Sequence, residues 1–168
     1  MTSFTKPGDH PDFFRLPPPP GRSRESTIRL DAEGRFWHEG EPVTHSGMGR
    51  AFASWISRHP DDGRFILSNG YDWSYFEVEG APMFVEGVRF DDGRPILCLF
   101  DGSEEPLDPE ALWSGEREAL YTRVKGSEFE ARFQPSAQVE LAPLLVEDEE
   151  GTVMLELFGR RFPVPHRP

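Results

Sequence analysis

The sequence predicts an α+β fold in which strongly curved, roll-like antiparallel β-sheets pack on one principal amphipathic helix. Short apolar runs alternate with turn-forming residues along most of the 168-residue chain, which carries 16 glycines and 17 prolines. Only residues 46–58 repeat apolar side chains with a helical period. No alternation of strands with helices is visible, so a Rossmann-type parallel sheet is not expected.

A chain of this length suits one compact domain or two small subdomains. Apolar residues make up 36 % of it, but 14 phenylalanines and four tryptophans supply bulky side chains for a core. We expect a flexible Pro-rich tail over residues 1–26, an N-terminal α+β half over 27–79 and a C-terminal β-rich half over 80–168. Whether the two halves form one compact unit is left open.

The predicted tail contains the stretch LPPPPGRSRES, in which Pro17–Pro20 favours an extended polyproline II conformation. Such a segment is typical of a flexible connection ahead of a domain. Phe13, Phe14 and Leu16 precede it, and exposed apolar side chains of this size are unfavourable in water. Packing of these three on the domain or on a partner therefore stays an alternative.

The first ordered element is a hairpin. TIRL over 27–30 alternates Ile28 and Leu30 on one face, and DAEG over 31–34 has the composition of a turn. The strand resumes in RFWHE over 35–39, and Gly40 and Pro42 end it.

The principal helix is predicted over residues 46–58. Its apolar side chains fall at offsets 0, 3, 4, 7 and 8, which makes one stripe along a helix. Thr44 or Ser46 is expected to cap its start, and Pro60 ends it. The stripe consists of Met48, Ala51, Phe52, Trp55 and Ile56.

Further hairpins follow, each predicted from two apolar runs around a turn. Asn69-Gly70 joins 64–68 to 75–79, and Asp91-Asp92-Gly93 joins 83–90 to 94–100. Gly126 separates 119–124 from 128–133, and two short strands around Gly159 end the chain. Residues 136–145 are ambiguous and are also compatible with a short helix.

The charge of the chain argues against some partner classes. The net charge is −12 and the sequence pI about 4.8, so phosphate backbones and anionic membranes are repelled. We therefore expect no nucleic acid and no membrane as partner, and an unidentified protein or small molecule instead. Residues 101–150 carry 14 acidic and four basic residues. They form either a solvated face or a docking surface for a basic partner. The oligomeric state is left open.

Cysteine usage and hydropathy point to the cytoplasm as the default location. The single cysteine, Cys98, lies in the apolar run PILCLF, which is typical of a small core residue. No apolar run reaches the length of a signal peptide or of a membrane span.

One cluster of metal-ligating residue types occurs in the stretch FWHEGEPVTHSG, and its geometry argues against a helical zinc site. His38 and His45 lie seven residues apart, whereas the zinc-protease box needs two histidines four apart on one helix. Gly40 and Pro42 between them exclude a continuous helix. A polar hairpin followed by a helix boundary explains the same residues, so we predict no metal, no cofactor and no catalytic residue.

Two alternatives remain open. In one, a loop over 38–45 with His38, Glu39 and His45 serves a small-molecule-binding or metal-dependent enzyme. In the other, a pocket between the curved sheet and the helix is lined by aromatic side chains such as Trp37 and Tyr75. Trp37, His38, Glu39, His45 and Tyr75 are the candidate ligand-binding residues.

Residues 27–88 carry a set of short motifs in order. They are Asp31, Gly34, Trp37, Gly40, Ala51-Phe52, Asp62-Gly63, Phe65, Leu67, Glu77-Val78-Glu79 and Ala81-Pro82. As a set these motifs resemble the bacterial domain of unknown function 1285 (DUF1285) family. The chain departs from the family pattern at Gly80, where an acidic residue is expected in EVEGAP. The resemblance implies an α+β fold of two roll-like halves, and it implies no activity and no catalytic residues.

The function expected from the sequence is a non-enzymatic cytoplasmic binding or interaction module. No catalytic signature is present, the chain is rich in aromatic residues, and its acidic charge is unevenly distributed. The sequence names neither the ligand nor the partner.

Overall fold

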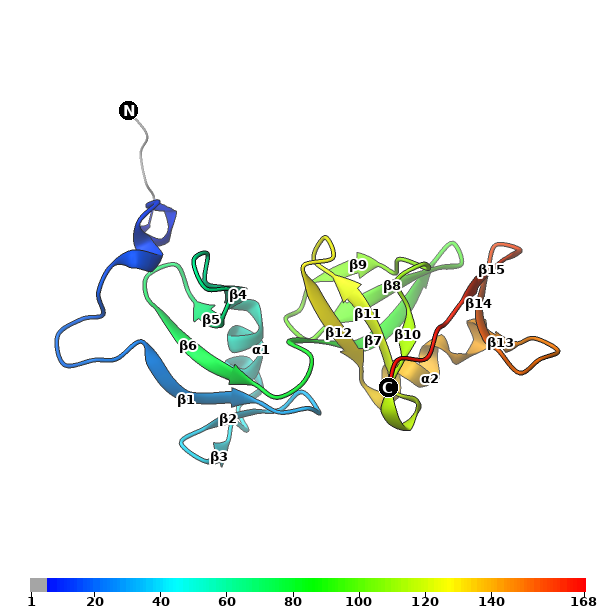
Figure 1. Cartoon of the computed structure of the whole chain (residues 1–168), viewed down its shortest axis with the longest axis horizontal. Helices are drawn as coiled ribbons and strands as arrows, with labels where there is room; N and C mark the ends of the chain where they lie inside the picture. Colours follow the sequence, from blue (N-terminus) through cyan, green and yellow to red (C-terminus); the bar gives the residue numbers. More distant parts are fainter. Residues whose placement is uncertain (1–5) are drawn as a thin grey trace. The chain divides into compact units, whose positions relative to one another are not determined.

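The computed structural model describes residues 6–168, which fall into two compact units divided after Gly80 (Figure 1). We call them the N-terminal unit and the C-terminal unit. Both combine β-sheets with a short helix, and the predicted α+β class is confirmed. Within the described residues, no helix has the length and apolar character needed to cross a membrane.

The N-terminal unit is built on one six-stranded sheet of order β3-β2-β1-β6-β5-β4 with the helix α1 (Figure 1). The predicted hairpins pair antiparallel, but β1 and β6 pair in parallel, with Leu30 opposite Val78. The sheet is therefore mixed. Its elements are β1 (Glu25–Leu30), β2 (Phe36–His38), β3 (Glu41–Pro42), α1 (Ser46–Ser54), β4 (Ile56–Arg58), β5 (Phe65–Ser68) and β6 (Trp73–Val78).

The helix is shorter than the predicted 46–58, and this boundary was wrong. Helix α1 ends at Ser54, and Trp55 is its C-cap. Ile56 to Arg58 instead form strand β4, where Ile56 lies opposite Leu67 and is buried. An apolar pair at the end of a helical stripe also suits a strand, and the pairing with β5 decides between them.

The segment 6–24 is part of the N-terminal unit and contacts the rest of it through Gly8, Phe13 and Arg15. Two 3₁₀ turns, η1 (Pro7–Asp9) and η2 (Phe13–Arg15), lie in this segment, which we call the N-terminal strap. Phe13 is 4 % exposed and packs with Ile66 and Trp73. The Arg15 guanidinium donates to the Asp61 carboxylate at 2.7 and 3.1 Å. Of the two alternatives for Phe13, the structure shows packing on the domain; Met1–Thr5 lie outside the described residues.

The C-terminal unit holds a six-stranded sheet of order β10-β11-β12-β7-β8-β9 and a three-stranded sheet β13-β14-β15 (Figure 1). Strands β7 and β12 pair in parallel, and the other pairs are antiparallel. The ambiguous residues 136–145 belong mainly to helix α2 and the turn η4. The elements are β7 (Met83–Asp91), β8 (Arg94–Leu99), β9 (Glu104–Pro106), β10 (Trp113–Ser114), η3 (Glu116–Glu118), β11 (Leu120–Val124), β12 (Phe129–Phe133), α2 (Pro135–Leu141), η4 (Ala142–Leu144), β13 (Leu145–Glu147), β14 (Val153–Leu157) and β15 (Arg160–Pro163).

Each unit has buried apolar side chains of its own. In the N-terminal unit Leu30 and Ile66 are fully buried, and in the C-terminal unit Phe84 and Phe133 are at most 1 % exposed. Cys98 on β8 is half-buried, and burial together with the Glu104 carboxylate raises the pKa of its thiol. The thiol form therefore predominates near neutral pH.

Candidate functional site

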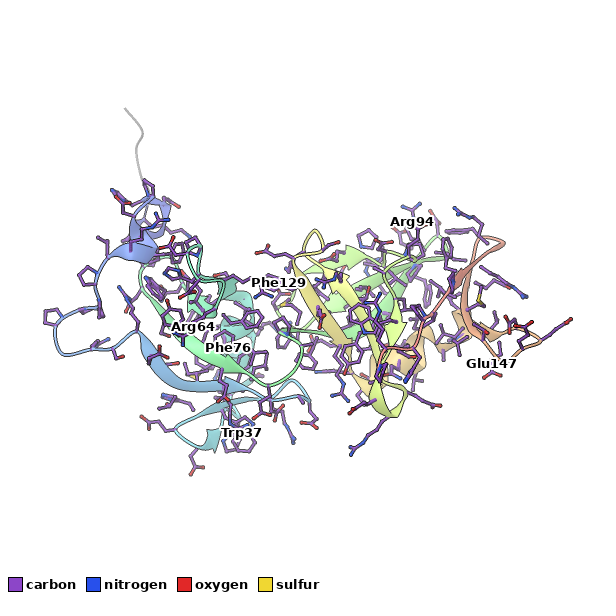
Figure 2. The ribbon with its side chains drawn as sticks, in the orientation of Figure 1. Trp37, Arg64, Phe76, Arg94, Phe129 and Glu147 are labelled. Atoms are coloured by element: carbon purple, nitrogen blue, oxygen red, sulfur yellow. The ribbon has the colours of Figure 1, made fainter. Side chains whose placement is uncertain are left out.

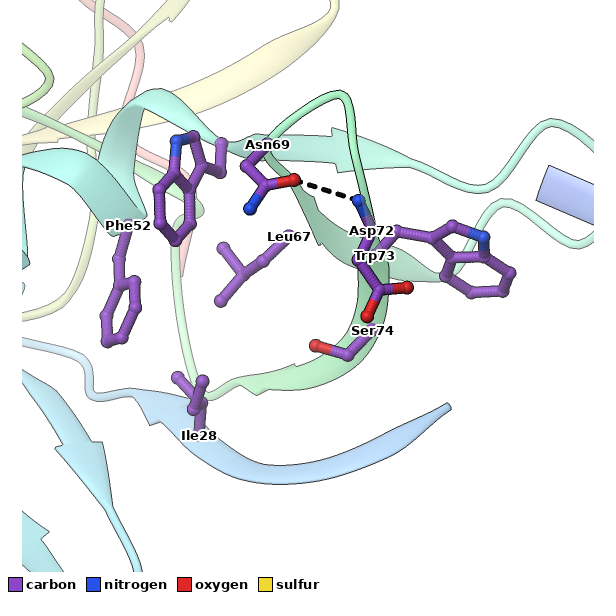
Figure 3. A pocket seen from close by; sticks show the side chains of 8 residues that line it. Ile28, Phe52, Leu67, Asn69, Asp72, Trp73 and Ser74 are labelled. Atoms are coloured by element: carbon purple, nitrogen blue, oxygen red, sulfur yellow. Dashed lines mark hydrogen bonds between the residues drawn. The ribbon is translucent and has the colours of Figure 1, made fainter. Parts of the chain in front are cut away.

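A pocket of about 170 Å³ lies in the N-terminal unit between helix α1 and the sheet (Figure 3). An apolar cavity of about 150 Å³ in another protein is large enough for benzene, so this pocket suits a group of similar size. Its lining comes from both layers and from the loop between β5 and β6. The lining residues are Ile28, Phe52, Trp55, Leu67, Asn69, Asp72, Trp73 and Ser74.

One wall of the pocket is apolar. Phe52 and Trp55 lie three residues apart at the end of α1, so they share one face of the helix. Their ring centroids are 5.7 Å apart and the ring planes are inclined by 56°. Ile28 from β1 and Leu67 from β5 complete this wall (Figure 3). The wall excludes water from one side of any bound group.

The other wall is polar and comes from the loop 69–72 and the start of β6. The Asn69 Oδ1 atom accepts the backbone N–H of Tyr71 at 2.8 Å. It also accepts the backbone N–H of Asp72 at 2.9 Å (Figure 3). This Asx turn makes a four-residue loop where Asn69-Gly70 predicted a two-residue hairpin turn. As a result, Asp72 and Ser74 line the side of the pocket opposite Phe52 (Figure 3).

Arg24 holds the Asp72 carboxylate in position. The Arg24 Nη1 atom donates to Asp72 Oδ1 and, at 2.9 Å, to the Trp73 carbonyl oxygen. Its guanidinium carbon also lies 4.4 Å from the centre of the Trp73 ring. Among the described residues nothing donates to Asp72 Oδ2, and the Asp72 side chain is 48 % exposed. One carboxylate oxygen at the pocket is therefore available to a ligand.

Three of the predicted binding residues lie in the β2–β3 hairpin, away from the pocket lining. Trp37 is half-buried on β2 (Figure 2), and its Nε1 atom donates to Asp31 Oδ2 at 2.9 Å. His38 is exposed and lies opposite Glu41. Glu39 is exposed in the left-handed region at φ 53° and, with Gly40, makes the two-residue turn of the hairpin.

His45 and Tyr75 occupy two further places. The His45 Nδ1 atom accepts the Met48 backbone N–H at 3.3 Å and so caps α1, where Thr44 or Ser46 was expected. Tyr75 on β6 donates its hydroxyl to Asp62 Oδ2 at 2.7 Å and stacks on His59 at 5.7 Å. Burial and this hydrogen bond raise the pKa of the Tyr75 hydroxyl.

The structure therefore does not bring the five predicted residues together. Within residues 6–168, no group of three or more His, Cys, Asp or Glu side chains is placed to hold a metal ion. A pocket between sheet and helix is present, but Trp37 and Tyr75 do not line it. Sequence reasoning assigned Phe52 and Trp55 to the core and Asn69 to a turn. The sequence features that could have indicated this site are Asn69 in a turn that also holds the acidic Asp72, and the aromatic pair Phe52 and Trp55 in the predicted helix.

Comparison with known proteins bears on the fold. No family model and no curated protein matches the chain. A DUF1285 family protein from Silicibacter pomeroyi DSS-3 has a similar structure, with a TM-score of 0.64 and 21 % identity over 96 % of this chain and 89 % of that one. The chain has the fold of a DUF1285 family protein. A second such protein, from Shewanella baltica OS155, gives a TM-score of 0.56 and 14 % identity over 72 % of this chain and 94 % of that one.

The DUF1285 resemblance that the sequence motifs indicated is thus confirmed at the level of the fold. The family designation, a domain of unknown function, names no activity. The function has to be argued from the residues of this chain.

Proposed function

We propose that this protein is a non-enzymatic binding module, located in the cytoplasm, whose N-terminal unit holds a small alkylammonium group in the pocket between α1 and the sheet. One observation carries the proposal: a pocket of about 170 Å³ is lined on one side by two inclined aromatic rings and on the other by Asp72, whose Oδ2 atom has no donor among the described residues. The amide, hydroxyl and carboxylate of the polar wall are suited to hold a group in place.

The chemistry of the two walls selects for a cation with an apolar stem. A cation within about 6 Å of an aromatic face gains roughly 0.5–2 kcal/mol, depending on its exposure. Phe52 and Trp55 offer such faces, and Asp72 Oδ2 accepts from an ammonium hydrogen. Ile28 and Leu67 contact the methylene groups of the stem. A neutral alcohol of the same length gains only the apolar part.

Charge supports the same choice at long range. The net charge of −12 attracts cations and raises their association rate at low salt. Close to the pocket the Arg24 guanidinium offsets part of the Asp72 charge, so we expect binding in the millimolar range for a free amine. The same chemistry is offered by a lysine side chain of a basic protein, whose other charges are attracted by the net negative charge of the chain.

Calorimetry and ¹H–¹⁵N NMR with n-butylammonium, n-butanol and butanoate test the proposal on the full chain. We expect the ammonium ion to bind at least fivefold more tightly than the alcohol and to shift the Trp55 indole signal. The variant Asp72→Asn keeps a hydrogen-bond acceptor and should remove this preference. Asp91→Asn, at the exposed end of β7 in the C-terminal unit, is the matched control and should leave it unchanged.

A second titration shows whether the bound cation is a free amine or a lysine side chain of a basic protein. A lysine-rich peptide that binds at least tenfold more tightly than butylammonium, with both weakened by Asp72→Asn, indicates a basic protein partner. Equal affinities indicate a free amine. Equal binding of butanol and butylammonium, or no shift of the Trp55 signal with either, would refute the proposal.

A further inference from the structure

A second and larger cavity lies wholly within the C-terminal unit. It is a groove of about 790 Å³ bounded by the segment 114–120, by the β13–β14 hairpin and by residues 164–166. This volume lies in the range of roughly 300–1,000 Å³ that is typical of ligand pockets. Apolar and polar residues both line the groove, and its acidic and basic side chains come from the segment 114–120 and from the β13–β14 hairpin.

One wall carries a fixed loop with an arginine. Arg117 and Glu118 adopt left-handed backbone conformations, with φ of 56° and 60°. Such conformations are unfavourable for these residues and persist where the surroundings hold them. Gln138 from α2 does so, because its Oε1 atom accepts the Leu120 N–H at 3.0 Å and its Nε2 atom donates to the Glu118 carbonyl oxygen at 3.3 Å. The loop is thus tied to the helix below it.

The Arg117 guanidinium has no hydrogen-bond or ion-pair partner in the described part of the chain. Ser114, at the start of the same wall, lies with its Oγ atom 3.1 Å from His166 Nδ1. This wall therefore presents a free cation and a hydroxyl within four residues of each other. A carboxylate is the ligand group that an arginine and a hydroxyl bind best.

The opposite wall is formed by the β13–β14 hairpin. Leu145, Val146 and Val153 supply aliphatic side chains, and Glu147 at the end of β13 is exposed (Figure 2). Glu147 has no ion-pair partner among residues 6–168. It is placed to accept from an ammonium group, while the aliphatic residues contact an apolar body.

The charges of the groove distinguish between ligand classes. Two carboxylates, Glu118 and Glu147, disfavour a ligand that carries only negative charge. Arg117 in turn disfavours one that carries only positive charge. A zwitterion with an apolar body satisfies both, and the volume exceeds the needs of a single amino acid.

We propose that this groove binds a short apolar peptide with both termini free. The peptide carboxylate pairs with Arg117 and the Ser114 hydroxyl, the terminal ammonium pairs with Glu147, and the side chains contact Leu145, Val146 and Val153. This site is separate from the pocket of the N-terminal unit, and it takes a ligand with a different charge pattern.

The test uses the tripeptide Leu-Val-Leu in three forms: with free termini, with an acetylated N-terminus and with an amidated C-terminus. Calorimetry on the full chain should show the free form bound at least tenfold more tightly than either capped form. Arg117→Asn should weaken the free form at least tenfold without weakening the amidated form further. Asparagine is chosen because it tolerates the left-handed backbone. Glu147→Gln should weaken binding of the free form at least tenfold without weakening the acetylated form further.

Controls separate this site from general charge effects. Arg94→Gln changes an exposed arginine of β8 outside the groove (Figure 2) and should leave binding within twofold. Arg117→Lys keeps the positive charge and should retain most of the peptide affinity. This result would show that residue 117 acts through its charge on the peptide carboxylate and not by maintaining the conformation of the loop. Asp72→Asn should have no effect. Equal affinities for the three peptide forms, or no binding of the free form, would overturn the proposal.

Discussion

Replacing Asp31 by asparagine should destabilise the N-terminal unit, because this buried carboxylate organises the first hairpin. Asp31 is 4 % exposed. Its Oδ1 atom accepts the backbone N–H groups of Glu33 at 3.0 Å and Arg35 at 2.9 Å. Its Oδ2 atom accepts from Arg35 Nε at 3.2 Å and from Trp37 Nε1 at 2.9 Å. Asparagine retains one of these two acceptor oxygens.

The magnitude follows from the donors that lose their partner. The Arg35 side chain is 68 % exposed, so its guanidinium turns to water at little cost. The Trp37 indole N–H is part-buried and loses a charged acceptor, which costs about 1–3 kcal/mol. Weaker bonds to the turn add to this, and we expect Asp31→Asn to lower the free energy of unfolding by about 2–3 kcal/mol.

Urea unfolding at pH 7, followed by tryptophan fluorescence, measures this difference. Glu33→Gln changes a largely exposed carboxylate in the same turn and should shift the free energy of unfolding by less than about 0.5 kcal/mol. A loss of the same size in both variants would show that the turn responds to charge in general and not to the Asp31 hydrogen bonds.

The pH dependence gives a second check. Burial alone raises the pKa of Asp31, but hydrogen bonds from Trp37 and from the Arg35 and Glu33 backbones outweigh it, so that the pKa lies below its usual value. The folded-state pKa is below that of the unfolded chain. The carboxylate therefore stabilises the fold above about pH 4 and loses this effect as the pH falls through the folded-state pKa. The gap between wild type and Asp31→Asn should shrink from pH 7 to pH 3, and a constant gap would refute the reasoning.

Three further variants test the N-terminal strap and the C-terminal core. Phe13→Ala removes a side chain buried against Trp73 and should cost up to about 3 kcal/mol, seen as faster tryptic cleavage in the strap. Gly8→Ala should speed the same cleavage, since a Cβ atom there would lie 2.9 Å from the Gly70 backbone; unchanged cleavage would show that the contact yields freely. Thr122→Val replaces a buried hydroxyl that lacks a partner among the described residues, and should raise the free energy of unfolding by about 1 kcal/mol, measured as a higher urea midpoint. A lower urea midpoint would contradict this prediction and show that the Thr122 hydroxyl makes a stabilising hydrogen bond.

Some elements of the fold depend on local sequence and were predicted correctly. Asp31 to Gly34 form the predicted turn between β1 and β2, and Asp92-Gly93 forms the turn between β7 and β8. These predictions depended on residues a few positions apart, which interact before any distant contact exists. The apolar stripe of α1 likewise placed Phe52 and Trp55 on one face.

The candidate pocket was only partly predictable. Its position between sheet and helix followed from the fold class, but its lining depends on which strands are neighbours. Ile28 and Ser74 reach the same pocket because β1 pairs in parallel with β6, and that pairing joins segments about fifty residues apart. Trp37 was a reasonable candidate from its residue type, but Asp31 engages its indole nitrogen.

The amino-acid sequence by itself determined the turns at 31–34 and 91–93, the start of the helix, the α+β class and the acidic composition, because each depends on local backbone preference or on composition. Only the tertiary structure decided the four-residue loop that begins at Asn69, the end of α1 at Ser54, the two parallel strand pairs and the pairing of Asp72 with Arg24. The physical reason is that local sequence leaves open which strand pairs with a given strand edge and which group pairs with a given charged side chain. Burial and strand register across distant segments select one of these partners.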